Sequence, residues 1–188
     1  MKTIAVLALQ GDFEEHEAVF KRLGAATCQL RQKRDLSRNY DALILPGGES
    51  TVQGKLLREL DMFDTIKEQI RSGLPVMATC AGTILLARQI LDDPTVHLGT
   101  LGISVRRNAY GRQISSFHTK ADFAGIKDVP VSFIRAPQIE FCTPEIQVLS
   151  EHDGRICAVR QGNQLAMTFH PELGDDSRAA EYFLSQMC

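Results

Sequence analysis

The 188-residue sequence contains no tryptophan, few aromatic residues and little net charge. Aromatic residues make up 6% of the chain, and 21 Lys and Arg against 23 Asp and Glu give a formal net charge of −2. Proteins that bind nucleic acid or an anionic membrane through their overall charge need a basic excess, so we expect neither partner. With 44% hydrophobic and 23% charged residues, the composition is that of an ordinary globular protein.

Long apolar runs are also missing. The apolar run Ile4–Leu9 is far too short to span a bilayer, and no small-residue cleavage site follows it. We therefore expect a strand at this position rather than a membrane helix or a signal peptide. The length suits one domain with a sizeable core, and no linker, repeat or low-complexity segment divides the chain. We expect a single domain over residues 1–188.

The cysteines show no pairing pattern. They are odd in number, widely scattered and without a Cys-x-x-Cys motif: Cys28, Cys80, Cys142, Cys157 and Cys188. This pattern argues against a disulfide framework and against a structural zinc site. We predict no metal and no cofactor, and a reducing cytoplasm is the simplest location.

The first half of the chain alternates between apolar strands and helical patterns. The predicted strands are Thr3–Leu9, Ala26–Leu30, Asp41–Leu45 and Pro75–Thr79. The predicted helices are Glu14–Leu23, Ser50–Arg71 in two pieces around Asp61, and Ala81–Leu91. Strands that are almost entirely apolar and alternate with helices are typical of a parallel sheet covered on both faces. In such sheets, binding sites form in the loops at the carboxyl ends of the strands.

The second half has shorter β-like runs separated by loops with Gly, Asn or Asp. The runs are Gly102–Arg106, Val131–Ile134, Ile146–Leu149, Ile156–Arg160 and Gln164–Phe169, and an amphipathic helix, Asp175–Met187, follows them. We expect these runs to form an antiparallel extension. The predicted fold class is therefore α/β, with three layers, a mostly parallel central sheet, helices on both faces and an antiparallel extension.

Cys80 stands directly after a predicted strand and directly before a predicted helix, among small residues. Small neighbours fit the strained strand-to-helix turn that exposes a nucleophile. A free thiol of pKa ~8.5 is only about 3% thiolate at neutral pH, but a helix N-terminus and a nearby imidazolium favour the thiolate. Taken alone, Cys80 is more often a small buried hydrophobic residue than a nucleophile.

His170 and Glu172 lie near the C-terminus, where Pro171 stops strand pairing after a predicted strand. Glu172 is placed to bond the imidazole of His170 and fix its tautomer, as a third triad member does. The alternatives are a structural histidine and an acidic residue at a helix start. The other histidines lack such a setting, and we interpret them as structural or solvated: His16, His97, His118 and His152.

A glycine-rich turn, Pro46-Gly47-Gly48-Glu49-Ser50-Thr51, follows the third predicted strand. Two glycines let backbone N–H groups turn toward a ligand, and with the N–H of Ala81 they would form an oxyanion hole. The alternative is an ordinary turn before a helix. A phosphate-binding loop fits poorly, because Lys55 is not in a Gly-Lys-Ser/Thr sequence.

Together these motifs resemble the class I, or triad, glutamine amidotransferases. The resemblance is nearest to one branch, the glutaminase subunits of pyridoxal 5′-phosphate synthase. The matching segments run nearly end to end: Leu7–Gly11, Leu45–Thr51, Thr79–Gly82, Arg107–Gln113, Phe133–Pro137, Gln161–Asn163 and Phe169–Glu172. The cysteine and histidine motifs indicate the triad family, and the Arg107–Gln113 and Phe133–Pro137 segments indicate the branch.

The resemblance implies that the protein hydrolyses L-glutamine to L-glutamate and ammonia through a γ-glutamyl thioester on Cys80. His170 would transfer the protons and Glu172 would orient His170. By family analogy the glutamine-binding residues are Gly48, Glu49, Ser50, Arg107, Ile134 and Arg135, and the oxyanion hole involves Gly47, Gly48 and Ala81. For the two arginines, ordinary surface charge is the alternative.

The resemblance also implies a partner. In the family, a (β/α)₈-barrel synthase subunit receives the ammonia and docking activates the glutaminase, with the Leu9-Gln10-Gly11 loop in the contact. Two rival functions stay open. One is another triad amidotransferase or γ-glutamyl hydrolase, and the other is a non-catalytic regulatory subunit, which would be expected to lack one of the three triad residues.

Overall fold

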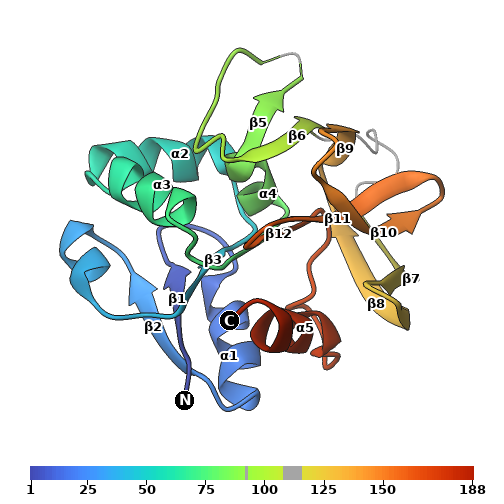
Figure 1. The fold of residues 1–188 in the computed structure, drawn as a ribbon, viewed down its shortest axis with the longest axis horizontal. Helices are drawn as coiled ribbons and strands as arrows, with labels where there is room; N and C mark the ends of the chain where they lie inside the picture. The colour runs from blue at the N-terminus through green and yellow to red at the C-terminus, as the bar shows by residue number, and fades with distance from the viewer. Residues whose placement is uncertain (92, 108–115) are drawn as a thin grey trace.

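The computed structural model describes residues 1–91, 93–107 and 116–188, and its main element is a large curled sheet (Figure 1). The strands of the first half are β1 (Thr3–Leu7), β2 (Ala26–Leu30), β3 (Ala42–Leu45), β4 (Val76–Thr79) and β5 (Ala87–Ile90). Those of the second half are β6 (Leu101–Arg106), β7 (Ser116–Phe123), β8 (Ile126–Ile134), β9 (Gln138–Cys142), β10 (Gln147–His152), β11 (Arg155–Gln161) and β12 (Gln164–Met167). The helices are α1 (Phe13–Arg22), α2 (Ser50–Glu59), α3 (Phe63–Arg71), α4 (Ala81–Leu86) and α5 (Arg178–Gln186), with a 3₁₀ turn at Lys33–Ser37.

The strands of the large sheet follow the order β2-β1-β3-β4-β12-β11-β9-β6-β5, and β10 pairs with β11. The pairs from β2 to β12 are all parallel. Beyond β12, the pairs β12–β11, β11–β9 and β9–β6 are antiparallel. The predicted class, a mostly parallel α/β sheet with an antiparallel extension, is confirmed.

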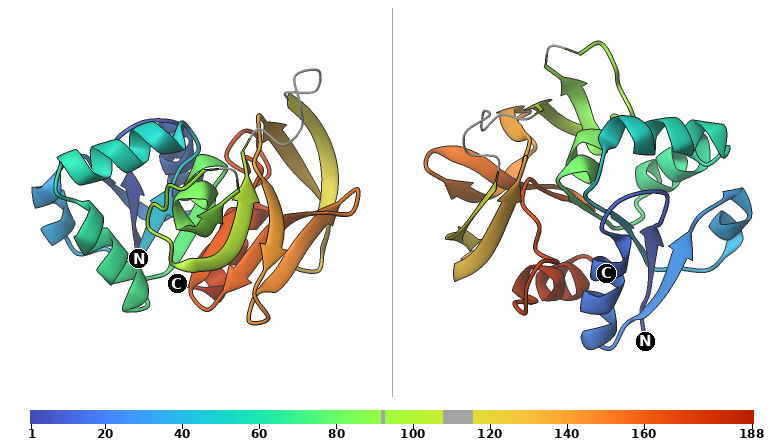
Figure 2. Two further views of the ribbon diagram at one scale, coloured as in Figure 1. Left: turned by 90° about the horizontal axis from the view of Figure 1, so that it is seen from above. Right: turned by 180° about the vertical axis from the view of Figure 1, so that it is seen from behind.

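Alternating side chains divide the core between the two faces of the parallel strands. On β1, Ala5 and Leu7 belong to one apolar cluster with residues of α2, α3 and α4, whereas Ile4 and Val6 belong to a second cluster with residues of α1 and α5. Strands buried on both faces must be apolar at every position, which explains the uninterrupted apolar runs in the sequence. The expected helical layers therefore cover both faces (Figures 1 and 2).

A separate hairpin, β7–β8, lies on the side of the molecule away from α2 and α3 (Figure 2). Its buried residues, among them Phe123, Val131 and Phe133, join the second apolar cluster. The backbone N–H of His170 donates to the carbonyl of Ser132 at 2.8 Å. The hairpin therefore packs directly against the segment that carries His170.

One element prediction is wrong. The expected helix Ala81–Leu91 ends at Leu86, and residues Ala87–Ile90 form β5, which pairs with β6. The run Gln164–Phe169 contains β12, which pairs antiparallel with β11 as expected and also pairs in parallel with β4, so that it joins the two parts of the sheet. The break at Asp61 between α2 and α3 is confirmed, and Asp61 has a φ of 54°. No helix within the described residues combines the length and apolarity needed to cross a bilayer.

Candidate active site

A cavity of about 690 Å³ opens at the carboxyl ends of the parallel strands. Four loops that follow β1, β3, β4 and β12 contribute to it, and its lining includes Asp12, Gly48, Cys80 and His170. The loop geometry of a parallel sheet predicts a site at this edge. The volume lies within the range usual for small-molecule sites.

Cys80 occupies the junction between β4 and α4, with φ 46° and ψ −103°. A non-glycine residue rarely adopts a positive φ, and surrounding hydrogen bonds must hold it there. The Cys80 N–H donates to the Met167 carbonyl at 2.9 Å, and the Thr83 hydroxyl donates to the same oxygen at 2.7 Å. β12 therefore fixes the strained turn that the small residues around Cys80 predicted.

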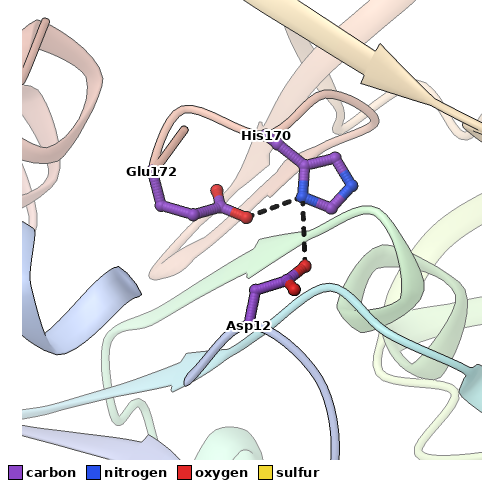
Figure 3. Close-up of side chains that lie close together, drawn as sticks. All are labelled: Asp12, His170 and Glu172. Atoms are coloured by element: carbon purple, nitrogen blue, oxygen red, sulfur yellow. Dashed lines mark hydrogen bonds and ion pairs between the residues drawn. The ribbon is translucent and has the colours of Figure 1, made fainter. Parts of the chain in front are cut away.

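His170 and Glu172 meet in the loop that follows β12. Nδ1 of His170 lies 2.6 Å from Oε1 of Glu172 (Figure 3), and both residues are 5% exposed. Since Nδ1 is engaged by the carboxylate, Nε2 is the ring nitrogen that remains for chemistry in the cavity. His170 lines the cavity with Cys80, whereas Glu172 lies behind it. The sulfur of Cys80 lies 3.9 Å from the Ile134 carbonyl oxygen.

The electrostatics of the pair favour an imidazolium. Burial alone would lower the pKa of His170, but hydrogen bonds to Cys80 and Glu172 and the charges of both outweigh it and raise the pKa to about 10. Burial likewise opposes ionisation of Glu172, yet the neighbouring His16 and the hydrogen bond with His170 lower its pKa. The two groups therefore form a charged, hydrogen-bonded pair at neutral pH.

Asp12 is a second carboxylate at the same ring nitrogen. Its Oδ2 lies 3.5 Å from Nδ1 of His170, so two carboxylates from different loops converge there (Figure 3). Burial raises the pKa of Asp12, and the charge of His170 opposes the shift. We did not predict Asp12 as a site residue; it lies in the loop between β1 and α1 and lines the same cavity as the glycine turn.

The glycine turn is held in place by hydrogen bonds with three residues. The Gly47 carbonyl accepts from the Asp12 N–H at 3.2 Å and from the Gln53 amide at 3.4 Å. The N–H of Glu49 donates to Oε1 of Gln10 at 2.7 Å. A Cβ at Gly47 would overlap the ring of His170, which explains the need for glycine there. Gly48 and Ala81 line the cavity, whereas Gly47 is not among its lining residues.

The residues expected to bind glutamine all line the cavity: Gly48, Glu49, Ser50, Arg107, Ile134 and Arg135. Arg107 is the best anchored, donating to the Thr51 hydroxyl at 3.1 Å and pairing with Asp93 at 3.2 Å. Arg135 has a φ of 43°, so the chain turns sharply after β8. The segment 108–113, which carried part of the resemblance, lies outside the described residues.

Structural comparison defines the class of protein. A solved structure titled as a crystal structure of glutamine amidotransferase matches with a TM-score of 0.92 at 43% identity, covering 96% of each chain. PurLQS from Thermotoga maritima matches with a TM-score of 0.75 at 14% identity over 100% of both chains, which shows a shared fold. The fold is that of a glutamine amidotransferase.

Sequence comparison gives the family. Residues 6–188 match the model of the SNO glutamine amidotransferase family, and the chain belongs to this family. "Pyridoxal 5'-phosphate synthase subunit PdxT" of Desulfitobacterium hafniense is 48% identical over 184 residues, covering 98% of this chain and 92% of the relative. The protein of that name from Bifidobacterium longum is 50% identical over 186 residues, covering 96% and 98%.

Proposed function

We propose a residue-level mechanism for the glutamine hydrolysis that this family carries out. The chain is a glutaminase, and the ammonia that it releases supplies pyridoxal 5′-phosphate biosynthesis. One observation supports the mechanism most strongly: Cys80 in its strained turn and His170, held at 2.6 Å by Glu172, line one cavity. Within one domain over residues 1–188, Cys80 acts as nucleophile, His170 as acid and base, and Glu172 as the group that orients His170.

The reaction begins with the thiol proton on His170. The thiolate of Cys80 attacks the carboxamide carbon of glutamine, and a tetrahedral intermediate forms. His170 then protonates the departing nitrogen, so the C–N bond breaks, ammonia leaves and a γ-glutamyl thioester remains. His170 next takes a proton from water, whose oxygen attacks the thioester, and glutamate leaves as the proton returns to Cys80.

The imidazolium of His170 contributes most to forming the thiolate. α4 has only six residues, Ala81–Leu86, so its dipole is weaker than that of the longer helix expected from the sequence. The ion pair requires a raised pKa of His170, which is the direction found. An imidazolium beside a thiol favours the thiolate, the nucleophilic form.

Glutamine binding uses the charges at the cavity mouth. Arg107 and Arg135 suit the α-carboxylate, because a guanidinium donates to both carboxylate oxygens at once. Glu49 suits the α-ammonium, and Ser50 and Ile134 also line the cavity. The N–H groups of Gly47, Gly48 and Ala81 are the proposed donors to the oxyanion, an interaction whose loss typically costs a hundred- to a thousand-fold in rate.

The proposed partner is the barrel subunit of pyridoxal 5′-phosphate synthase. The relatives are named as subunits of that synthase, which supports a complex. Ammonia is mostly protonated in neutral water and then no longer nucleophilic, so a sheltered transfer to an acceptor on the partner serves the chemistry. We propose the cytoplasm as the location, since all five cysteines are free thiols.

The test is glutamate release from L-glutamine by this chain alone and with the barrel subunit added. We expect strong stimulation by the partner and loss of activity in Cys80→Ala. Cys28→Ala is the matched control, because Cys28 is a half-buried cysteine of β2 outside the cavity. Full activity without a partner would indicate a stand-alone amidohydrolase, and activity retained in Cys80→Ala would refute the nucleophile.

A further inference from the structure

A buried histidine that the proposed mechanism does not use lies behind Glu172. His16 is on α1 and is 1% exposed. Its Nε2 lies 3.5 Å from Oε2 of Glu172 and 3.0 Å from the hydroxyl oxygen of Thr79, the residue before Cys80. One ring therefore contacts both the carboxylate that orients the base and the strand that carries the nucleophile.

The second oxygen of Glu172 needs such a neighbour. Oε1 bonds His170, whereas Oε2 is buried and makes no hydrogen bond among the described residues. A buried carboxylate oxygen without a donor is costly, and the carboxyl group then tends to take up a proton. Nε2 of His16 lies 3.5 Å from this oxygen, a distance that a small shift of either side chain turns into a hydrogen bond.

We infer that His16 is a positioning residue, which holds the Glu172 carboxylate ionised and directed at His170 from behind. The inference rests on the proposed function. His16 does not contact the cavity, so it acts on catalysis only through Glu172 and Thr79.

The charges around His16 suit a neutral ring. Four titratable groups act on His16. Asp12 and Glu15 belong to its own segment, and His170 and Glu172 belong to the loop after β12. Burial lowers the pKa of His16, and the positive His170 acts in the same direction, whereas the three carboxylates oppose the shift. A neutral imidazole that donates from Nε2 stabilises Glu172 without placing a second full positive charge near His170.

Loss of the His16 donor should change the pH dependence of activity through the ionisation of Glu172. An N–H donor on Nε2 of His16, 3.5 Å from Oε2, stabilises the ionised form of this carboxylate. Removing the donor raises the pKa of Glu172, so Glu172 is protonated at a higher pH and stops orienting His170. The acid limb of kcat/KM for glutamine must then move to higher pH.

The test compares His16→Leu, which keeps bulk without a donor, with His16→Gln, which keeps an N–H donor. In the full chain with the barrel subunit present, we expect the acid limb in His16→Leu to move up by about one pH unit, a loss on the order of tenfold on that limb. We expect His16→Gln to stay within about a third of that shift. His152→Gln is the control, because His152 lies on β10 outside the cavity, and its profile should match the unmodified chain.

An unchanged acid limb in His16→Leu, or equal shifts in both His16 variants, would overturn the inference. If His16→Leu does not fold, ¹⁵N NMR of the unmodified protein still decides it. We expect His16 as the neutral Nε2–H tautomer from pH 6 to 8, and a charged ring or an Nδ1–H tautomer would contradict the role. The NMR result does not depend on turnover, so it stays separate from any failure of the Cys80 assignment.

Discussion

At the scale of single residues, His170 and Glu172 share one short contact but carry out different tasks. In the proposed mechanism His170 transfers the protons, whereas Glu172 orients the imidazole ring through its 2.6 Å contact with Nδ1. We expect His170→Ala to lose on the order of 10² to 10⁴ in kcat, as removal of a general acid–base does. Glu172→Gln should lose less, because an amide oxygen still accepts from Nδ1.

The measurement is kcat for glutamate release by both variants at one pH and with saturating partner. Circular dichroism of each variant checks that the fold is intact. A larger loss in Glu172→Gln than in His170→Ala would reverse the two roles.

Much of the site could be predicted from local sequence, since Cys80, the glycine turn and the His170 motif each follow a strand that the sequence marks. Asp12 and His16 could not be predicted in the same way. Their contacts with His170 and Glu172 depend on how the β1–α1 segment packs against the loop after β12, residues that are more than 150 positions apart. A lone histidine in an amphipathic helix carries no local signal of such a contact.

At the scale of elements, α4 shows where local pattern fails. The sequence from Ala81 to Leu91 is apolar enough for one helix. Residues Ala87–Ile90 nevertheless form a strand that pairs with β6, and Arg88 and Gln89 are exposed on it. Tertiary pairing overrides helix propensity when the propensity differences are small. β7 was missed although Phe117, Ala121 and Phe123 alternate with polar residues, a pattern typical of a half-buried strand.

The packing of α4 against β3 gives a prediction about Gly82. A Cβ at this position would overlap the carbonyl oxygen of Leu45, the last residue before the glycine turn. Since backbone atoms cannot swing aside, Gly82→Ala should lower the free energy of unfolding by about 1–3 kcal/mol. It should also reduce glutamate release, because it pushes Cys80 away from the glycine turn.

Urea unfolding followed by circular dichroism measures this change. Gly174→Ala is the matched control, since no atom lies within 4 Å of a Cβ there, and it should change stability by less than about 0.5 kcal/mol. Equal stabilities of the two variants would contradict the tight packing of α4 on β3.

At the scale of the whole molecule, an aromatic cluster connects the hairpin to the catalytic loop. The ring centroid of Phe123 lies 6.4 Å from the ring centroid of Phe169, the residue before His170. It lies 5.3 Å from the ring centroid of Tyr182 on α5. The ring centroids of Phe133 on β8 and Phe169 are 6.0 Å apart. The hairpin, the parallel sheet and α5 therefore share one core, and we expect them to unfold as one unit.

Phe123→Ala tests this integration. Phe123 is fully buried, so the truncation should cost about 3–5 kcal/mol, a large part of the 5–15 kcal/mol typical of a domain. We expect one urea transition at a lower midpoint, monitored at the same time by circular dichroism and by glutamate release.

Phe141→Ala is the control, since Phe141 is 67% exposed and its truncation should shift the midpoint little. If the hairpin were an independent appendage, Phe123→Ala would leave the main transition and the activity at the level of Phe141→Ala. Coincident loss of structure and activity would instead place the hairpin, His170 and the sheet in one cooperative domain.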